Sequence, residues 1–152
     1  MSIFHRTIDI EIDEGKQGVL VLRTRLTDMY HDIILKLTVE VGKFIISDAS
    51  VELKRTPHPD CSQIQALVQS MTGLQVGPGF TREVLSAMGG EHGCPNMVNL
   101  ILLTAPLSMN AAAVLRQRQE GLSEAEMNSL WQEVLGGVCV AYKKDPGRDG
   151  RK

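Results

Sequence analysis

The sequence predicts an α+β fold, in which an antiparallel meander of three or four strands is followed by helices packed on one face of the sheet. In the first third of the chain, apolar and polar residues alternate with the period of two that half-buried strands show. From Asp60 onward, apolar residues recur at three- and four-residue spacing, which is typical of helices. Strands that precede helices in this way favour one sheet and one helical layer.

Four strands are predicted in the first third of the chain. Apolar and polar residues alternate clearly in the first three, and the fourth follows the third directly. A turn over 15–18 separates the first two runs, and Gly42-Lys43 fits a tight two-residue turn between the last two. The four predicted strands are 8–12, 20–26, 33–41 and 44–53.

The first two predicted helices follow glycine-marked boundaries. Asp60 with Gln63 resembles a capping box at the start of the first helix, and Gly73 is placed to end it. The loop 77–79 is glycine-rich but lacks the spacing of a phosphate-binding loop, so we interpret it as a turn. Thr81 is the expected cap of the second helix, which Gly89-Gly90 ends.

Two further helices complete the pattern. One begins at Cys94-Pro95, because proline is favoured at the first helical position, and Pro106 should kink or divide it. Ser123 with Glu126 forms a second capping box, and Gly136-Gly137 closes that helix. We expect a single α+β domain over residues 1–142 and a disordered basic tail over 143–152.

Charge and composition argue against several classes of protein. The 152 residues carry 16 Lys and Arg against 18 Asp and Glu, so a strongly basic nucleic-acid binder is not expected. The apolar runs 33–35 and 100–103 are too short to cross a membrane, and 1–10 lacks the apolar core of a secretory signal. We therefore expect a cytoplasmic protein. Three cysteines indicate thiols or metal ligands rather than a disulfide framework.

Histidines, cysteines and one aspartate cluster at three element boundaries, where functional residues often project. Imidazole, thiolate and carboxylate groups together are the ligands of zinc and iron–sulphur sites. If the third strand begins where the two helices begin, the three loops meet at one end of the sheet. The candidate metal ligands are His31, Asp32, His58, Cys61, His92 and Cys94.

The cysteine positions leave the chemistry open. Cys61 and Cys94 lie near predicted helix starts, where the helix dipole favours the thiolate. A thiolate there could bind a metal, transfer sulphur or carry out redox chemistry, and each cysteine could equally be a small buried hydrophobe. Cys139 lies between two valines, which favours the buried interpretation. The chain has no GxSxG motif, so a hydrolase triad has little support.

An ordered set of short motifs resembles an uncharacterised bacterial domain family of unknown function. Its members read H-D-hydrophobic, I-x-D-A, P-x-C, G-x-x-I-G-x-G and L-G-G-x-x-G-C-T-H in that order. The matching pieces here include His31-Asp32-Ile33, Ile46-Ser47-Asp48-Ala49, Cys61, Gly77-Pro78-Gly79 and Gly93-Cys94. The resemblance covers about residues 5–115. This chain has Pro95-Asn96 where the family has Thr-His, so a histidine ligand would be lost there unless His92 or Asn96 replaced it.

A more distant resemblance is to the NifU/IscU type of iron–sulphur scaffold, a small antiparallel sheet with helices on one face. In that family three cysteines and an aspartate hold zinc or a nascent cluster. The resemblance implies that Asp32, Cys61 and Cys94 match the aspartate and two of the cysteines. The first cysteine would fall near Tyr30 and is absent, which leaves His31 as the nearest candidate.

Three interpretations of function follow, in the order we favour them. The first is a metal- or iron–sulphur-binding protein with a carrier or scaffold role. The second is a structural or interaction domain with a degenerate site, and the third is a cysteine-dependent sulphur-transfer or thiol enzyme. The last predicted helix, with Trp131 on its apolar face, could dock a protein partner or form a homodimer, although we expect it to pack within the chain. Neither nucleic acid nor a membrane is an expected partner.

Overall fold

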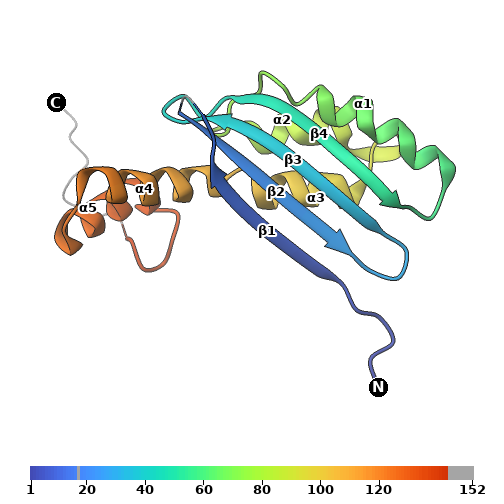
Figure 1. The fold of residues 1–152 in the computed structure, drawn as a ribbon, viewed down its shortest axis with the longest axis horizontal. Helices are drawn as coiled ribbons and strands as arrows, with labels where there is room; N and C mark the ends of the chain where they lie inside the picture. Colours follow the sequence, from blue (N-terminus) through green and yellow to red (C-terminus); the bar gives the residue numbers. More distant parts are fainter. Residues whose placement is uncertain (17, 144–152) are drawn as a thin grey trace. The chain divides into compact units, whose positions relative to one another are not determined.

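A computed structural model describes residues 1–16 and 18–143 of the chain. The predicted tail, apart from Lys143, lies outside the described residues. Four antiparallel strands form one sheet in the order β1-β2-β3-β4, so each strand pairs with its neighbour in sequence (Figure 1). The predicted meander is confirmed. The strands are β1 (Thr7–Glu14), β2 (Val19–Thr27), β3 (Asp32–Glu40) and β4 (Ile46–Arg55).

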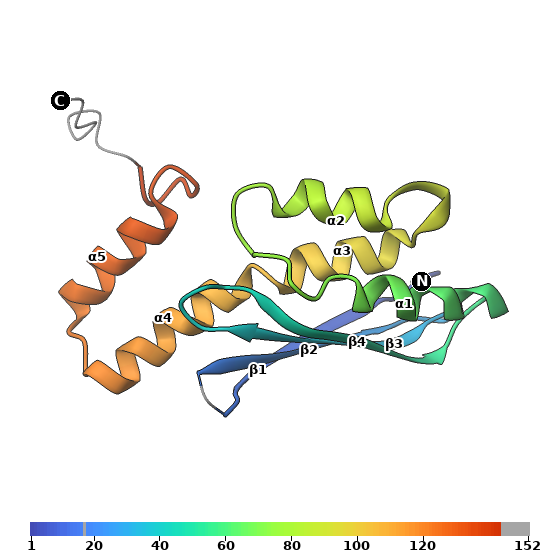
Figure 2. The ribbon, with the colours of Figure 1, turned by 90° about the horizontal axis from the view of Figure 1, so that it is seen from above.

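Helical elements follow the sheet along the chain. Figure 2 shows α1, α2 and α3 on the same side of the sheet, which confirms the α+β class. Two short 3₁₀ turns, η1 and η2, precede α1 and α3. The elements are η1 (Pro59–Gln63), α1 (Ile64–Gln69), α2 (Phe80–Met88), η2 (Gly90–His92), α3 (Pro95–Thr104), α4 (Leu107–Glu120) and α5 (Glu124–Leu135).

The chain divides into two compact units, Met1–Ala111 and Ala112–Lys152. The first unit contains the sheet, α1 to α3 and the start of α4. The second contains the rest of α4 and all of α5. The expectation of one domain over 1–142 stays a prediction.

The core of the first unit lies between the sheet and its helices. Alternate residues of β2 and β3 point into it, and Leu22, Leu35 and Leu37 are fully buried. Met97, Leu100 and Ile101 of α3 are at most 1% exposed. The predicted strand periodicity therefore identified the covered face of β2 and β3. A buried polar pair joins the layers, because Oγ1 of Thr24 on β2 lies 2.6 Å from Oγ1 of Thr104 on α3.

Several predicted boundaries are confirmed. Cys94 is the N-cap of α3 and Pro95 its first residue, while α3 ends before Pro106 and α4 begins after it. The capping box of Ser123 and Glu126 is present at the start of α5.

Other predicted boundaries were wrong. The β3–β4 turn is longer than two residues, because the Phe44 N–H donates to the Glu40 carbonyl and the Glu40 N–H donates to the Ile45 carbonyl. Both Gly42 and Phe44 adopt positive φ angles, of 91° and 53°. The structure therefore uses a second left-handed residue that the Gly42-Lys43 pattern did not indicate.

The starts of two helices were also misplaced. His58 rather than Asp60 caps η1, because its Nδ1 accepts the Asp60 N–H at 3.2 Å. Gly79, at a φ of 89°, replaces Thr81 as the N-cap of α2. Helix α1 ends at Gln69, four residues before Gly73. The Gly73 N–H donates to the carbonyl of Ile46, the first residue of β4.

One helical stretch, Pro95–Glu120, is long and apolar enough by length and composition to cross a membrane, with a mean hydropathy of 1.7 in its most apolar window. The apolar runs 33–35 and 100–103 are each too short to indicate such a stretch, which extends over both α3 and α4. Core helices pass the same test, and the α3 part supplies Met97, Leu100 and Ile101 to the core.

Candidate functional site

A buried carboxylate lies in the turn between β2 and β3. Asp28 opens this turn, and its backbone N–H donates to the His31 carbonyl at 2.9 Å. Its Oδ1 accepts the N–H groups of Tyr30 and His31, both at 2.8 Å. Aspartate favours such positions because its carboxylate can accept hydrogen bonds from the backbone a few residues later. The turn is therefore held by a side chain that is itself fully buried.

Arg6 neutralises this buried charge from the N-terminal segment. Its Nε and Nη2 both donate to Oδ2 of Asp28, at 2.9 and 2.6 Å. At the end of β4, Arg55 Nη2 donates to the Asp28 carbonyl oxygen at 2.6 Å. Burial by itself raises the pKa of Asp28. The hydrogen bonds from Tyr30, Arg6 and His31 outweigh burial and hold that pKa well below its ordinary value.

His31 joins the turn to the start of α3. Its Nδ1 lies 3.1 and 3.3 Å from the two carboxylate oxygens of Asp28, and its Nε2 lies 3.3 Å from Asn96 Nδ2. Arg6 Nη1 donates to Asn96 Oδ1 at 2.9 Å. We call Arg6, Asp28, His31 and Asn96 the Asp28 cluster. Its four side chains close a ring of hydrogen bonds.

The ring assigns the histidine tautomer. A guanidinium only donates hydrogen bonds, so the Asn96 oxygen faces Arg6 and the Asn96 amide NH₂ faces His31. Nε2 of His31 must then accept, and the proton lies on Nδ1, from which it is donated to Asp28. The side chain of His31 is 17% exposed.

The structure separates His31 from its sequence neighbour Asp32. The two oxygens of Asp32 accept hydrogen bonds from Arg25, at 2.9 and 2.8 Å, on the open face of the sheet. These bonds lower the pKa of Asp32. Adjacent strand residues face opposite sides, so His31 turns toward Asp28 while Asp32 turns away.

The other predicted ligands lie on loops and helix starts. His58 is 68% exposed beside Asp60, and His92 is 90% exposed beside Glu91. Cys61 in η1 and Cys94 at the N-cap of α3 are half-buried free thiols. Across 1–16 and 18–143, no three His, Cys, Asp or Glu residues are grouped to hold a metal ion. The predicted ligand set therefore stays a prediction.

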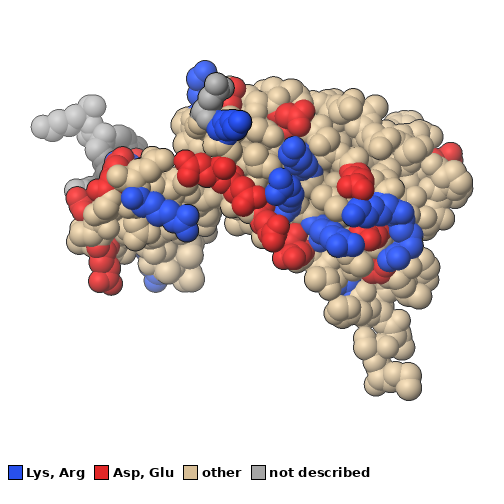
Figure 3. All heavy atoms as spheres, in the orientation of Figure 1, with Lys and Arg blue, Asp and Glu red and all other residues tan. Residues whose placement is uncertain are grey.

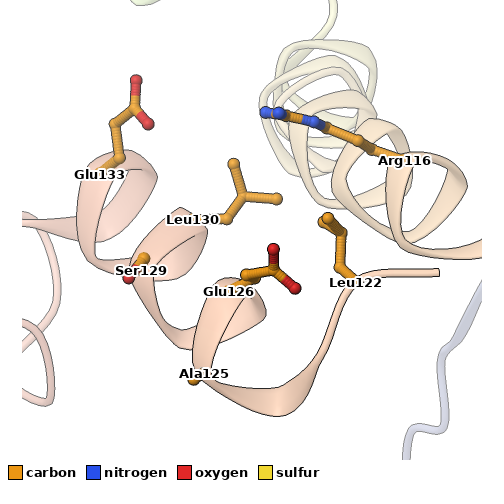
Figure 4. Close-up of a pocket in the computed structure, with 7 residues that line it drawn as sticks. All are labelled: Arg116, Leu122, Ala125, Glu126, Ser129, Leu130 and Glu133. Atoms are coloured by element: carbon orange, nitrogen blue, oxygen red, sulfur yellow. The ribbon is translucent and has the colours of Figure 1, made fainter. Parts of the chain in front are cut away.

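A groove of about 390 Å³ lies elsewhere, in the second unit between α4 and α5 (Figure 4). It contains no cysteine or histidine, so it offers neither of the ligands that zinc prefers. Arg116 on its rim is already paired with Glu120, 3.0 Å away. Its lining residues are Arg116, Leu122, Ala125, Glu126, Ser129, Leu130 and Glu133.

Comparison with known proteins places the first unit in a family. The family model described as "Protein of unknown function (DUF2889)" matches residues 4–110. The chain belongs to the DUF2889 family. The match covers all four members of the Asp28 cluster, together with Cys61 and Cys94. The function of DUF2889 proteins is uncharacterised, and no curated protein or solved structure matches this chain.

Three members of the cluster were missed or undervalued by sequence reasoning. Asp28 had a usable signal, because aspartate is favoured at the first position of a turn and stands three residues before His31. Arg6 had none, since it lies 22 residues from Asp28 and 90 from Asn96. Asn96 was considered only as a substitute ligand, and the structure places it against His31.

Proposed function

We propose that this DUF2889 protein binds a transition metal, as zinc or within an iron–sulphur cluster, at the end of the sheet around His31, and serves as a carrier or scaffold. The observation that carries the proposal is the contact between Nδ1 of His31 and the buried Asp28 carboxylate. Metal-binding histidines commonly donate their second ring N–H to a carboxylate, which fixes the tautomer and makes the ligand nitrogen more basic. His31 has that arrangement, with Nε2 as the nitrogen left to bind.

The two predicted cysteine ligands suit the same metals. Cys94 is two residues before Asn96 and is the N-cap of α3. Cys61 lies in η1, which follows β4 at the end of the sheet where β3 begins. One imidazole and two thiolates are zinc ligands and leave a fourth position open. An open position suits a carrier that passes its metal to another protein.

Binding would require local rearrangement. Asn96 Nδ2 occupies the acceptor direction of His31 Nε2, so the metal must displace this amide. Asp28 and Asp32 are engaged by Arg6 and Arg25, which favours the thiols over these carboxylates as partners of His31. We expect the carrier to work in the cytoplasm with a protein partner or as a homodimer, without nucleic acid or a membrane.

A second candidate is a structural or interaction domain whose site has degenerated. The closed ring favours it, because Asn96 satisfies the nitrogen that a metal would need. The thiol-enzyme alternative gains no such support, since no side-chain hydrogen bond joins a cysteine thiol to a histidine ring in the described ranges 1–16 and 18–143.

Elemental analysis tests the proposal directly. Untagged protein should be purified without chelator, aerobically and anaerobically, and its zinc and iron measured with an absorption spectrum. We expect about one zinc or iron per chain, lost in His31→Ala, Cys94→Ser and Cys61→Ser. Cys139→Ser and His5→Gln are matched controls that remove the same chemical groups elsewhere and should keep the metal.

Cobalt titration separates the two candidates. Asn96→Ala frees Nε2 of His31, so a metal site should bind Co²⁺ at least as tightly as the wild type and show thiolate charge-transfer absorption. A purely structural ring predicts lower stability in Asn96→Ala and no cobalt spectrum in any variant. Absence of metal in both preparations and after reconstitution would reject metal binding.

A further inference from the structure

Strand β1 is an open edge of the sheet. It pairs with β2 in an unbroken register from Thr7↔Thr27 to Glu14↔Leu20. Its other side has no backbone partner within residues 1–16 and 18–143. Its eight residues contain no proline or bulge, two of the features with which proteins protect an edge strand. Alternate N–H and carbonyl groups of β1 are thus left available for a further strand.

The opposite edge of the sheet is covered at the start of β4. At the start of β4, the Ile46 N–H donates to Leu74, and the Gly73 N–H donates to the Ile46 carbonyl. Ile45 forms an isolated bridge with Gln75. The pairing of β3 with β4 also shifts register twice. A loop and irregular pairing therefore disfavour strand addition at β4.

The inner face of β1 continues the apolar surface of the sheet without the same cover. On β2, Leu22 and Leu26 are at most 1% exposed. On β1, Ile8 is 40% exposed, and Ile10 and Ile12 are only half-buried. A strand added beside β1 would bury more of these isoleucines if its own inward residues were apolar.

The outer face of β1 is acidic. Figure 3 shows acidic side chains gathered along β1, next to basic side chains of the neighbouring strand. Asp9 and Glu11 stand opposite Arg25 and Arg23 in the register. However, Arg25 is paired with Asp32 and Arg23 with Asp13. Within the described residues, Asp9 and Glu11 therefore have no ion pair, and they could accept cations from a new strand.

We propose that β1 binds an extended segment of a partner protein as a fifth, antiparallel strand, and that this segment alternates apolar residues with Lys or Arg. The pattern matches β2, which already pairs with the other side of β1 through Leu22, Arg23, Thr24, Arg25 and Leu26. A second copy of β1 is the wrong occupant. Symmetric antiparallel pairing of two β1 strands places acidic residues opposite acidic residues, and such pairs are destabilising.

The test uses a fluorescein-labelled seven-residue peptide in which arginine alternates with valine and threonine. Fluorescence anisotropy should show saturable binding to the full chain, and hydrogen exchange should slow at β1 amides. The charge-reversed variant carrying Asp9→Lys and Glu11→Lys should weaken binding about tenfold, as expected for two lost cross-strand ion pairs. Glu52→Lys, on β4 of the same sheet, is the matched control and should leave binding unchanged.

Two further measurements separate strand addition from charge attraction alone and from pairing with a second copy of the chain. A peptide methylated at alternate backbone nitrogens keeps its charge but cannot pair with the edge, so it should lose binding. Equal binding of that peptide would show charge attraction alone and overturn strand addition. Sedimentation of the free protein gives the other arm, because dimerisation abolished by Ile10→Pro would assign β1 to a second copy instead. Melting curves verify that each variant is folded.

Discussion

Nδ1 of His31 lies 3.1 Å from Oδ1 of Asp28, a carboxylate whose side chain is fully buried. The same oxygen holds two backbone N–H groups of the turn, and the second oxygen holds Arg6. One carboxylate thus orders a turn, a histidine and the N-terminal segment. This arrangement makes Asp28 a structural centre whether or not His31 binds a metal.

Replacing Asp28 by asparagine should destabilise the first unit. Asparagine can still accept the turn N–H groups, but it removes the charge that Arg6 neutralises. Hydrogen bonds to charged groups contribute about 1.5–3 kcal/mol each, and the partial exposure of Arg6 reduces its share, so we expect a loss of about 2 kcal/mol. Urea unfolding measures the difference. Asp32→Asn, which changes an exposed pair with Arg25, should cost clearly less.

The effect of Asp28 should depend on pH. Its pKa in the folded protein lies below the ordinary value of 3.8. The charged form is therefore favoured by folding, and the stability that it contributes is complete well above that value. It is lost as the pH falls below 3.8 toward the folded pKa. The stability gap between wild type and Asp28→Asn should be equal at pH 7 and pH 5 and smaller at pH 3, as unfolding curves at these three pH values would show. A constant gap between them would contradict the assignment.

The buried hydroxyl pair between sheet and helix predicts non-additive mutations. Thr24→Val or Thr104→Val leaves one buried hydroxyl without its partner and should cost about 1–3 kcal/mol. The double variant replaces both hydroxyls by methyl groups of similar shape and should cost less than the sum. A double-mutant cycle by chemical denaturation measures this coupling. Strict additivity would show that the two hydroxyls do not depend on each other.

The loop between α2 and α3 should not tolerate a side chain at Gly93. A Cβ atom there would lie 1.6 Å from the Met88 carbonyl oxygen, so the backbone must move. We expect Gly93→Ala to cost about 3 kcal/mol, at the upper end of overpacking effects. Gly77→Ala is the matched control, because its Cβ would meet no atom within 4 Å. Thermal melting of both variants gives the comparison, and equal melting temperatures would contradict the close approach.

Much of the fold was predictable because its signals are local. The alternation in β2 and β3 identified the buried face, since neighbouring strand residues point to opposite sides. Pro95, Pro106 and the Ser123–Glu126 capping box marked helix boundaries through backbone geometry that each residue imposes on its own neighbours. Membership of an uncharacterised domain family was also predicted, and the DUF2889 match over 4–110 confirms the prediction at that level.

At one boundary that failed, a distant segment competed for the backbone groups of the predicted helix end. Gly73 was expected to end a helix, but its N–H donates to Ile46 on β4. The hydrogen bond of Gly73 thus pairs two segments that are far apart in the chain, which no local pattern records.

In the candidate site, too, local sequence signals and long-range contacts determined different features. By itself the sequence determined that histidines, cysteines and acidic residues would lie at element boundaries, because their neighbours end strands and begin helices. Only the tertiary structure decided their partners. Asp32 pairs with Arg25. Arg6 pairs with Asp28, 22 residues away, and Asn96 contacts His31, 65 residues away. Burial of a charge demands a partner from wherever the fold can supply one, and that choice depends on the whole packed chain.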